Sequence, residues 1–320
     1  RDLHSFPTRR SSDLLKNLVA AQFECGFEIA GVLTNPPATR GRHSDLIPTE
    51  VSAVARASNI PVFEFDHLMS EAREAIAPLG ADLLVSFDYG RIFGPKFLAL
   101  FPLGGINLHP SSLPKYRGCT PVPAAILNGD KNLGVTVQKL ALQTDEGDIL
   151  AQTEIPLDGT ETTLSLMDGN GETSKITEAG SKLLKKVLKE IAHSDSEIIG
   201  KKQSGETSYT NFLKKEDGFI DWQKSAAEIE RKIRAYTPFP LCSCLWNSVR
   251  VTILKARVSE SKTGEKAGTV LPYQKSVGIE IACGDGSILV ATELQQEKKK
   301  AMDYKSFING ARGFVGSVLC

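Results

Sequence analysis

The feature that most constrains the fold of this chain is a repeated alternation of helical and strand patterns between residues 50 and 109. Each helical pattern leads to an apolar strand pattern, and the pairs are residues 50–58 with 60–65, 70–77 with 82–87, and 97–101 with 105–109. Strands joined by helices are typical of parallel sheets, because the helix returns the chain to the same end of the sheet. The alternation therefore predicts an α/β fold with a doubly wound, mainly parallel, Rossmann-like sheet.

The last third of the chain carries a different pattern, in which short strand-like runs are separated by glycine turns. This pattern is typical of small barrels and predicts a C-terminal β-barrel of the OB type. A length of 320 residues exceeds the usual size of one domain and favours two. The predicted organisation is an α/β catalytic domain at residues 15–192, a polar linker at 193–208 and an OB-like domain at 209–320.

The first fourteen residues, RDLHSFPTRRSSDL, have neither helical nor strand periodicity. They also resemble translated sequencing-adapter sequence, so we treat residues 1–14 as an artificial segment and exclude them from the fold prediction. The apolar pattern that follows predicts a helix up to Gly26 and then a strand over residues 27–33.

Charge is balanced over the whole chain but not along it. Residues 1–200 carry 19 Lys and Arg against 25 Asp and Glu, whereas residues 201–320 carry 19 against 13. The basic C-terminal part suits a polyanion, although such an excess is also typical of an ordinary solvated surface. The six cysteines lack zinc-site spacing, and no run has the ~20 apolar residues of a membrane span. We therefore expect a cytoplasmic protein without a metal site.

The segment from residue 105 to residue 148 carries the residues best suited to chemistry. Asn107 and His109 are two apart in a predicted strand, so their side chains share one face. Prolines and serines at residues 110–114 then begin a loop, and α/β proteins keep their sites in such strand-end loops. A second alternating run leads to Asp145, which can return a carboxylate to the imidazole. Amide, imidazole and carboxylate together indicate acyl transfer.

The same segment resembles a known enzyme family. The run INLHPSSLPKYRG at residues 106–118, followed by GDKNLGVT and then by DEGDIL at residues 145–150, is similar to the signature of the folate-dependent formyltransferases. The similarity is greatest to the branch that formylates methionyl-tRNA. The resemblance implies that Asn107, His109 and Asp145 are the catalytic residues. It also implies transfer of a formyl group from 10-formyltetrahydrofolate to the α-amino group of initiator methionyl-tRNA.

The resemblance also implies where the formyl donor binds. A turn whose backbone faces the pterin corresponds to Tyr89 and Gly90, and glycine permits such a close approach. From the residues alone, a tight turn without a ligand role stays open for this segment. The folate-contacting loop of the family corresponds to four consecutive residues, Ser111, Ser112, Leu113 and Pro114.

Two basic segments resemble the tRNA contacts of the family. The polar loop at residues 35–48 contains Arg42, which matches an arginine that enters the acceptor arm of tRNA. In the C-terminal domain, Lys298, Lys299 and Lys300 are candidates for phosphate contact, and a solvated basic loop is the open alternative. The implied partners are the folate co-substrate and initiator methionyl-tRNA. We expect the protein to act as a monomer and not to bind a membrane.

The residues leave other functions open. A similar Asn, His and Asp group occurs in glycinamide ribonucleotide formyltransferases, formyltetrahydrofolate hydrolases and sugar-amine formyltransferases. The Arg42 loop and the second domain favour tRNA as the acceptor. A non-catalytic tRNA-binding protein is an alternative of another class, because the apolar first strand and the G-T-P-x-F turn of the family are not found here. The serines after His109 lack the G-x-S-x-G elbow of a serine hydrolase.

Overall fold

The computed structural model describes residues 9–39, 45–169, 173–194 and 199–320, and these form two compact units. Two short segments of the predicted N-terminal domain fold with the second unit. Most of the predicted linker folds with the first. Unit 1 contains residues 9–121, 132–156 and 165–210, and unit 2 contains residues 122–131, 157–164 and 211–320.

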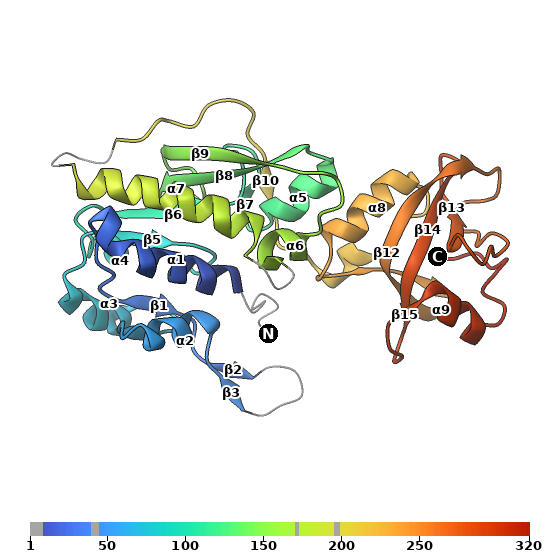
Figure 1. Cartoon of the computed structure of the whole chain (residues 1–320), viewed down its shortest axis with the longest axis horizontal. Helices are drawn as coiled ribbons and strands as arrows, with labels where there is room; N and C mark the ends of the chain where they lie inside the picture. Colours follow the sequence, from blue (N-terminus) through green and yellow to red (C-terminus); the bar gives the residue numbers. More distant parts are fainter. Residues whose placement is uncertain (1–8, 40–44, 170–172, 195–198) are drawn as a thin grey trace. The chain divides into compact units, whose positions relative to one another are not determined.

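Unit 1 alternates helices and strands, as the sequence pattern predicts (Figure 1). The helices α5 (Pro121–Asn128) and α6 (Thr163–Asp168) belong partly to each unit, because the division into units falls within them. The helical elements of unit 1 are α1 (Arg9–Cys25), α2 (Glu50–Ala57), α3 (Ser70–Ile76), the 3-10 turn η1 (Ala77–Leu79), α4 (Pro95–Leu98) and α7 (Lys175–Ala192). Its strands are β1 (Val32–Thr34), β2 (Ala38–Thr39), β3 (Leu46–Ile47), β4 (Val62–Glu64), β5 (Leu84–Ser86), β6 (Gly105–His109), β7 (Arg117–Gly118), β8 (Asn132–Lys139), β9 (Ile149–Pro156) and β10 (Tyr209–Thr210).

The main strands of unit 1 form two sheets. Strand β1 pairs in parallel with β4, and a four-stranded sheet has the order β5-β6-β8-β9. Strands β5 and β6 are parallel, but β8 runs antiparallel to both β6 and β9. The domain is Rossmann-like, yet the prediction of a mainly parallel sheet is wrong for the half that contains β8 and β9. Parallel neighbours need a crossover of about a dozen residues or more, and the connection between Lys139 and Ile149 is shorter.

Helix α1 begins at Arg9 and therefore includes residues 9–14, which the fold prediction left out. Leu14, Leu18 and Ala21 are spaced by three or four residues and are buried, which anchors one face of the helix in the core. Extending an existing helix adds about one hydrogen bond per residue that is fixed. The polar residues before Leu14 therefore take helical structure although they show no apolar periodicity.

Helix α7 covers one face of the four-stranded sheet and runs along β8 and β9 (Figure 1). It begins at the N-cap Ser174, whose hydroxyl accepts a hydrogen bond from the Thr177 N–H at 3.0 Å. A Cβ at Gly180 would lie only 2.5 Å from Cδ2 of Leu108, so the absence of a side chain at Gly180 allows the helix to pack closely against β6. Leu108 stands between Asn107 and His109, and α7 thereby fixes the face of β6 opposite to these two residues.

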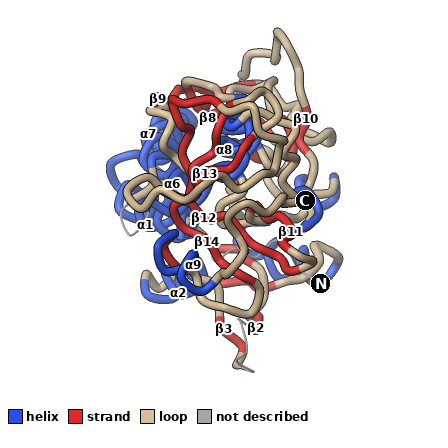
Figure 2. The backbone as a smooth tube through the Cα atoms, turned by 90° about the vertical axis from the view of Figure 1, so that its right-hand side faces the viewer, coloured by secondary structure: helices blue, strands red, loops and turns tan. Residues whose placement is uncertain are grey.

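Unit 2 is built on an antiparallel sheet in which the long strands β12 and β14 run side by side (Figure 2). The sheet order is β11-β12-β14-β13, and β15 also pairs with β14. The elements are η3 (Lys215–Gly218), α8 (Ala226–Ala235), β11 (Cys242–Trp246), β12 (Val249–Lys262), β13 (Ile279–Ala282), β14 (Ser287–Gln296), β15 (Met302–Asp303) and α9 (Tyr304–Gly310).

The sheet of unit 2 does not close into a barrel through its named strands, so the OB-like prediction is not confirmed. Irregular segments lie beside the two outer strands instead. Leu245 of β11 exchanges two backbone hydrogen bonds with Cys320, and Leu319 donates one to the oxygen of Gly268. The Gly268 N–H in turn donates to the oxygen of Ala282 in β13. Segments this short carry no strand periodicity, which is why the sequence did not predict them.

Two further observations concern the cysteines and the helices. All six cysteines carry free thiols, and Cys242 and Cys244 are both buried in β11. Along the described parts of the chain, no helix combines the length and the apolar character that crossing a lipid bilayer requires.

Replacing Ser225 with alanine removes a capping box at the start of α8, in which the Ser225 hydroxyl and the Glu228 carboxylate each accept a backbone N–H of the other residue. We expect Ser225→Ala to lower the free energy of unfolding of unit 2 by about 1 kcal/mol. The two tryptophans of the chain, Trp222 and Trp246, both lie in this unit, so their fluorescence in a urea titration reports on it. Ser261→Ala, an exposed serine in β12, is the control, and equal midpoint shifts for both variants would contradict the capping role.

Candidate active site

Strand β6 presents two polar candidate residues on one face. Asn107 and His109 alternate with buried apolar residues that face α7, as the strand pattern predicts. The antiparallel register pairs Asn107 with Gln138 of β8 and His109 with Thr136 of β8. Residues paired in this way lie on the same face of a sheet, so four polar side chains gather there.

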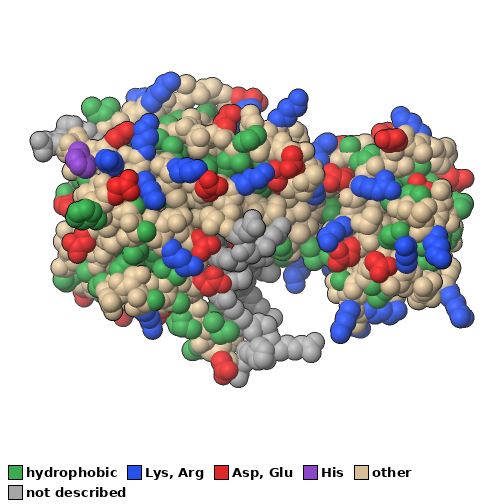
Figure 3. Space-filling view, in the orientation of Figure 1, with side chains coloured by type: hydrophobic (Ala, Val, Ile, Leu, Met, Phe, Trp, Pro, Cys, Tyr) green, Lys and Arg blue, Asp and Glu red, His purple; other side chains and the backbone are tan. Residues whose placement is uncertain are grey.

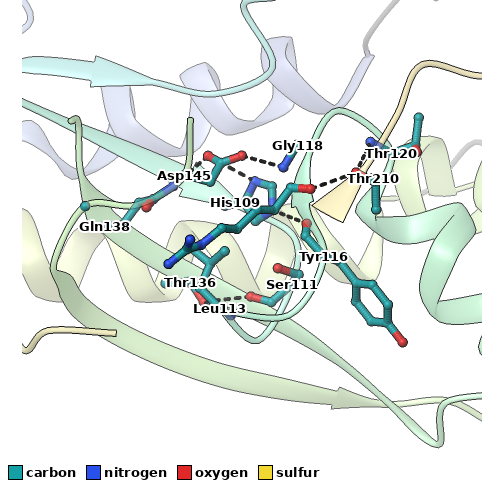
Figure 4. A network of polar contacts seen from close by, with 12 residues as sticks. His109, Ser111, Leu113, Tyr116, Gly118, Thr120, Thr136, Gln138, Asp145 and Thr210 are labelled. Atoms are coloured by element: carbon teal, nitrogen blue, oxygen red, sulfur yellow. Dashed lines mark hydrogen bonds and ion pairs between the residues drawn. The ribbon is translucent and has the colours of Figure 1, made fainter. Parts of the chain in front are cut away.

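The imidazole of His109 lies between two oxygen acceptors (Figure 4). Its Nε2 is 2.9 Å from the backbone oxygen of Tyr116, and its Nδ1 is 3.6 Å from Oδ1 of Asp145. A carbonyl oxygen can only accept, so Nε2 carries a proton in either charge state of the ring. The residue is 5 % exposed, and the two contacts therefore fix the ring orientation with little competition from water.

Asp145 reaches the imidazole from residues 144–148, which we call the acidic turn. Its backbone is left-handed, with a φ of 55°, a conformation that aspartate tolerates better than most residues. The carboxylate accepts the Gly118 N–H on Oδ2 at 2.8 Å and Nε2 of Gln138 on Oδ1 at 2.7 Å. Both oxygens are therefore held, and Oδ1 is the one that faces His109 (Figure 4).

The predicted folate loop is tied to β8 by its own polar groups. The hydroxyl of Ser111 donates to the backbone oxygen of Lys115 at 2.6 Å, and the hydroxyl of Thr136 donates to the backbone oxygen of Ser111 at 2.6 Å. The side chain of Gln152 in β9 adds a hydrogen bond to the oxygen of Leu113 at 2.9 Å. Ser111 and Leu113 are buried, so their side chains shape the loop from within.

The other two residues of that loop differ in their exposure to solvent. Pro114 is buried, but Ser112 is only half-buried. The loop rests directly on β8, because a Cβ at Gly134 would overlap the backbone of Ser112. Of the four residues of this loop, Ser112 is the partly exposed one, and its hydroxyl oxygen lies against Gly134.

The second predicted folate segment follows β5 at the same sheet edge. Ser86 of β5 pairs with Asn107 of β6, so the carboxyl ends of these two parallel strands lie next to each other. Gly90 has a φ of 73°, and the space where a Cβ would stand is open. The ring of Tyr89 stacks on Phe93 at 5.5 Å, and burial raises the pKa of Tyr89 to about 12, which keeps its phenol neutral.

The predicted tRNA contacts lie elsewhere on the chain. Arg42 lies outside the described residues, and the strands that precede and follow it in sequence, β2 and β3, pair antiparallel. Lys298, Lys299 and Lys300 are exposed in the turn between β14 and β15 of unit 2. In Figure 3, Lys and Arg side chains gather over the part of unit 2 that carries β15 and α9.

Several side chains of the site were missed by the sequence analysis. Gln138 was detectable, because it is a polar residue two positions after Thr136, on the same strand face and close in sequence to Asp145. Gln203 was not, because it lies in a polar stretch that reads as a linker. In the structure, Nε and Nη2 of Arg117 donate to Oε1 of Gln203 at 3.1 and 2.8 Å. Thr210 accepts the Thr120 N–H at 3.0 Å (Figure 4).

Other chemistries find less support in this unit. Among the residues that the structure describes, no group of three or more His, Cys, Asp and Glu side chains is arranged to hold a metal ion. Desolvation, and then the nearby carboxylate of Asp145, raise the pKa of the Cys119 thiol above its usual value. A thiol in that state is a poor nucleophile.

Two family models match the chain. The model described as "Formyl transferase" covers residues 8–188, and the model described as "Formyl transferase, C-terminal domain" covers residues 213–312. The first match alone spans more than half of the chain and includes Asn107, His109 and Asp145. The chain belongs to the formyl transferase family.

Curated members of this family are similar over nearly the whole length. The methionyl-tRNA formyltransferase of Treponema denticola is 42 % identical over 312 residues, which is 93 % of each chain. The methionyl-tRNA formyltransferase of Borreliella afzelii is 35 % identical over 303 residues, with 91 % of this chain and 90 % of the other covered. Formyl transfer is thus the activity of the family that this sequence joins.

Solved structures of other formyl transferases share the fold. WlaRD, a sugar 3N-formyl transferase solved with dTDP and 5-N-formyl-THF, aligns with a TM-score of 0.62 at 20 % identity over 92 % of this chain and 96 % of that one. HypX from Aquifex aeolicus in complex with tetrahydrofolic acid aligns with a TM-score of 0.60 at 19 % identity over 83 % of this chain and 45 % of that one. At such identities the likeness concerns the fold.

A substitution at Gly147 tests whether the acidic turn needs its exact position, because a Cβ at this residue would overlap the backbone oxygen of Lys139. We expect Gly147→Ala to displace Asp145 from His109 and to slow formyl transfer at least about tenfold, since a shift of ~1 Å at a catalytic group can cost on the order of 100-fold. Gly264→Ala is the matched control, because nothing lies within 4 Å of a Cβ added at that position. Normal single-turnover rates for Gly147→Ala would show that the turn needs no exact placement.

Proposed function

We propose that this chain transfers the formyl group of 10-formyltetrahydrofolate to the α-amino group of initiator methionyl-tRNA. The observation that carries the proposal is the imidazole of His109 facing Asp145 at 3.6 Å, on the strand that also presents Asn107. This group lies inside the matched formyl transferase region. The similarity to methionyl-tRNA formyltransferases over both units supports a tRNA acceptor.

The reaction replaces one C–N bond with another. The amine nitrogen of the acceptor bonds to the formyl carbon, the bond from that carbon to N10 of the donor breaks, and one proton passes from the amine to N10. Negative charge develops on the formyl oxygen on the way, and each donor aimed at that oxygen supplies about 3 kcal/mol in comparable sites. Asn107 and His109 are the donors in this proposal, and Asp145 holds the imidazole and accepts the amine proton directly or through water.

The hydrogen-bond pattern of His109 assigns a role to each ring nitrogen. Nε2–H donates to the backbone oxygen of Tyr116, and Nδ1 faces the carboxylate of Asp145. A formyl oxygen that takes the place of the Tyr116 oxygen therefore meets a donor that already carries its proton. Catalytic hydrogen bonds often reach their final geometry only when the substrate is bound.

The edge formed by β5 and β6 suits the pterin of the donor. The open, left-handed position at Gly90 lets the backbone meet a flat ring, and the stacked pair Tyr89 and Phe93 lies at the same turn. Ser112, the partly exposed residue of the loop after His109, is the other proposed contact of the donor. The bound donor supplies the activated formyl group, and these residues orient it.

In this proposal unit 2 binds the tRNA. The OB-like barrel stays a prediction for this unit. Arg42 and the exposed lysines at residues 298–300 are the proposed phosphate contacts. We also propose a monomer in the cytoplasm, and the six free thiols agree with a reducing compartment.

A direct assay separates this function from its alternatives. The purified chain is incubated with 10-formyltetrahydrofolate and either methionyl-tRNA, glycinamide ribonucleotide, an amino sugar nucleotide or no acceptor. Formyl-methionine released from the tRNA supports the proposal. Formate without acceptor would indicate a hydrolase, transfer to another amine would indicate that acceptor class, and tRNA binding without any reaction would indicate a binding protein.

Removing either proposed donor tests the catalytic roles. We expect Asn107→Ala and His109→Ala each to lower the single-turnover rate by about 100-fold or more, because an oxyanion donor is worth about that factor. Neither side chain contacts tRNA in the proposal, so the affinity for methionyl-tRNA in a gel-shift titration stays within about twofold of the unchanged chain. Lost tRNA affinity together with a normal single-turnover rate would reverse the assigned roles.

Replacing Lys298, Lys299 and Lys300 with alanine tests the basic turn. Each phosphate contact contributes about 0.7 to 0.9 to the slope of log affinity against log salt, so we expect the triple variant to flatten this slope by roughly 2. The charge-matched control replaces Lys182, Lys186 and Lys189, which are exposed on α7. Parallel slopes for the triple variant and the unchanged chain would remove the turn from the tRNA interface.

A further inference from the structure

The segment at residues 201–210, which we call the strap, forms part of the site although its composition predicts a linker. Lys201 exchanges two backbone hydrogen bonds with Ile149 of β9, both at 2.8 Å. Ser208 accepts the Tyr116 N–H on its hydroxyl at 2.9 Å and the Arg117 N–H on its backbone oxygen at 2.9 Å. The strap is therefore anchored at both ends to the strands and loops that surround His109.

Gln203 is the strap residue that reaches the acidic turn. Its Nε2 lies 2.8 Å from the backbone oxygen of Asp145, 2.8 Å from that of Gly147 and 3.3 Å from Oε1 of Gln138. Its Oε1 accepts from two nitrogens of the Arg117 guanidinium. Since a guanidinium only donates and a backbone oxygen only accepts, the amide of Gln203 has a single allowed orientation.

This orientation determines the orientation of Gln138. The Oε1 of Gln138 accepts from Gln203, so its Nε2 is the atom that points to Asp145 and donates to Oδ1 at 2.7 Å. Oδ1 is also the oxygen that faces Nδ1 of His109. A line of hydrogen bonds thus runs from the cation of Arg117 through two amides to the carboxylate that orients the imidazole, and each bond polarises the next.

The same strap holds the backbone of the acidic turn. Gln203 binds the oxygens of Asp145 and Gly147, while the residue between them, Glu146, pairs with Nη1 of Arg117 at 2.9 Å and accepts from the Tyr209 hydroxyl at 2.7 Å. Three consecutive residues of the turn are therefore fixed from outside. The left-handed backbone of Asp145 is kept in place by these contacts.

We propose that Gln203 is a positioning residue of the formyl-transfer site, which sets both the place and the hydrogen bonding of the Asp145 carboxylate. This inference rests on the proposed function, because it concerns the same reaction. Gln203 touches neither the formyl group nor the amine. It acts through Gln138 and the acidic turn, so its loss changes the rate of the chemical step and leaves substrate binding as it was.

Gln203→Glu is the sharpest variant, because it keeps the size of the side chain and changes one atom. The new carboxylate still pairs with Arg117, but its second oxygen faces the backbone oxygens of Asp145 and Gly147, which repel it. The amide of Gln138 then turns its own N–H groups toward residue 203 and presents Oε1 to Asp145. Gln203→Met, which fills a similar volume without donors or acceptors, loses the contacts and adds no repulsion.

The measurements are kcat and KM for both substrates, and the melting temperature, for the full chain and three variants. We expect kcat to fall at least about tenfold in Gln203→Glu and less in Gln203→Met, with both KM values within about twofold, since only the transition state uses the lost placement. Glu206→Ala is the control on the strap, because Glu206 is exposed. Its kcat stays unchanged.

The outcomes separate this inference from the function on which it rests. A full chain that transfers no formyl group would refute the proposed function itself. An active chain whose Gln203→Glu and Gln203→Met variants keep their kcat would overturn the positioning role alone. Losses of kcat that follow the loss of melting temperature in both variants would also overturn it, because they would show a purely structural contribution.

Discussion

The structure of unit 1 depends on keeping one carboxylate against one imidazole at the end of β6. His109 comes from the strand and Asp145 from a left-handed position in the acidic turn, so neither secondary structure alone brings them together. The antiparallel pairing of β8 with β6 matters here, because it places Gln138 opposite Asn107, and Gln138 binds Asp145 from there. Gly118 and Gln138 then bind the two carboxylate oxygens, and the pair is fixed before any substrate arrives.

The layer beneath this pair is polar and yet almost dry. Thr136 and Gln138 are 0 and 1 % exposed, and both have hydrogen-bond partners on their side-chain atoms. A buried polar layer of this kind is rigid when it is satisfied, because every change of rotamer leaves a donor or an acceptor unpaired. The glycines at the contact points, such as Gly134, allow the loop after His109 to rest on that layer without a gap.

Much of the site was predictable from the sequence, and the failures have a common physical origin. Period-two alternation placed Asn107 and His109 on one face, because strand geometry is local. The direction of β8 and the role of Gln203 depend on contacts between distant segments, and a side chain that binds backbone oxygens leaves no periodic trace. The polar composition of the strap predicted a linker, although Gln203 of the strap forms hydrogen bonds to the acidic turn. The segments beside the outer strands of unit 2 escaped prediction because each spans only a few residues.

The strap also changes how the protein can be divided. A fragment that ends with α7 at Ala192 looks like a natural catalytic domain from its composition, but it would lack Gln203, Ser208 and Thr210. Without Gln203, the backbone oxygens of Asp145 and Gly147 would lose their donor, and the Arg117 guanidinium would lose one of its acceptors. Slower chemistry is the expected consequence of such a cut, and a boundary after Thr210 would at least keep the strap.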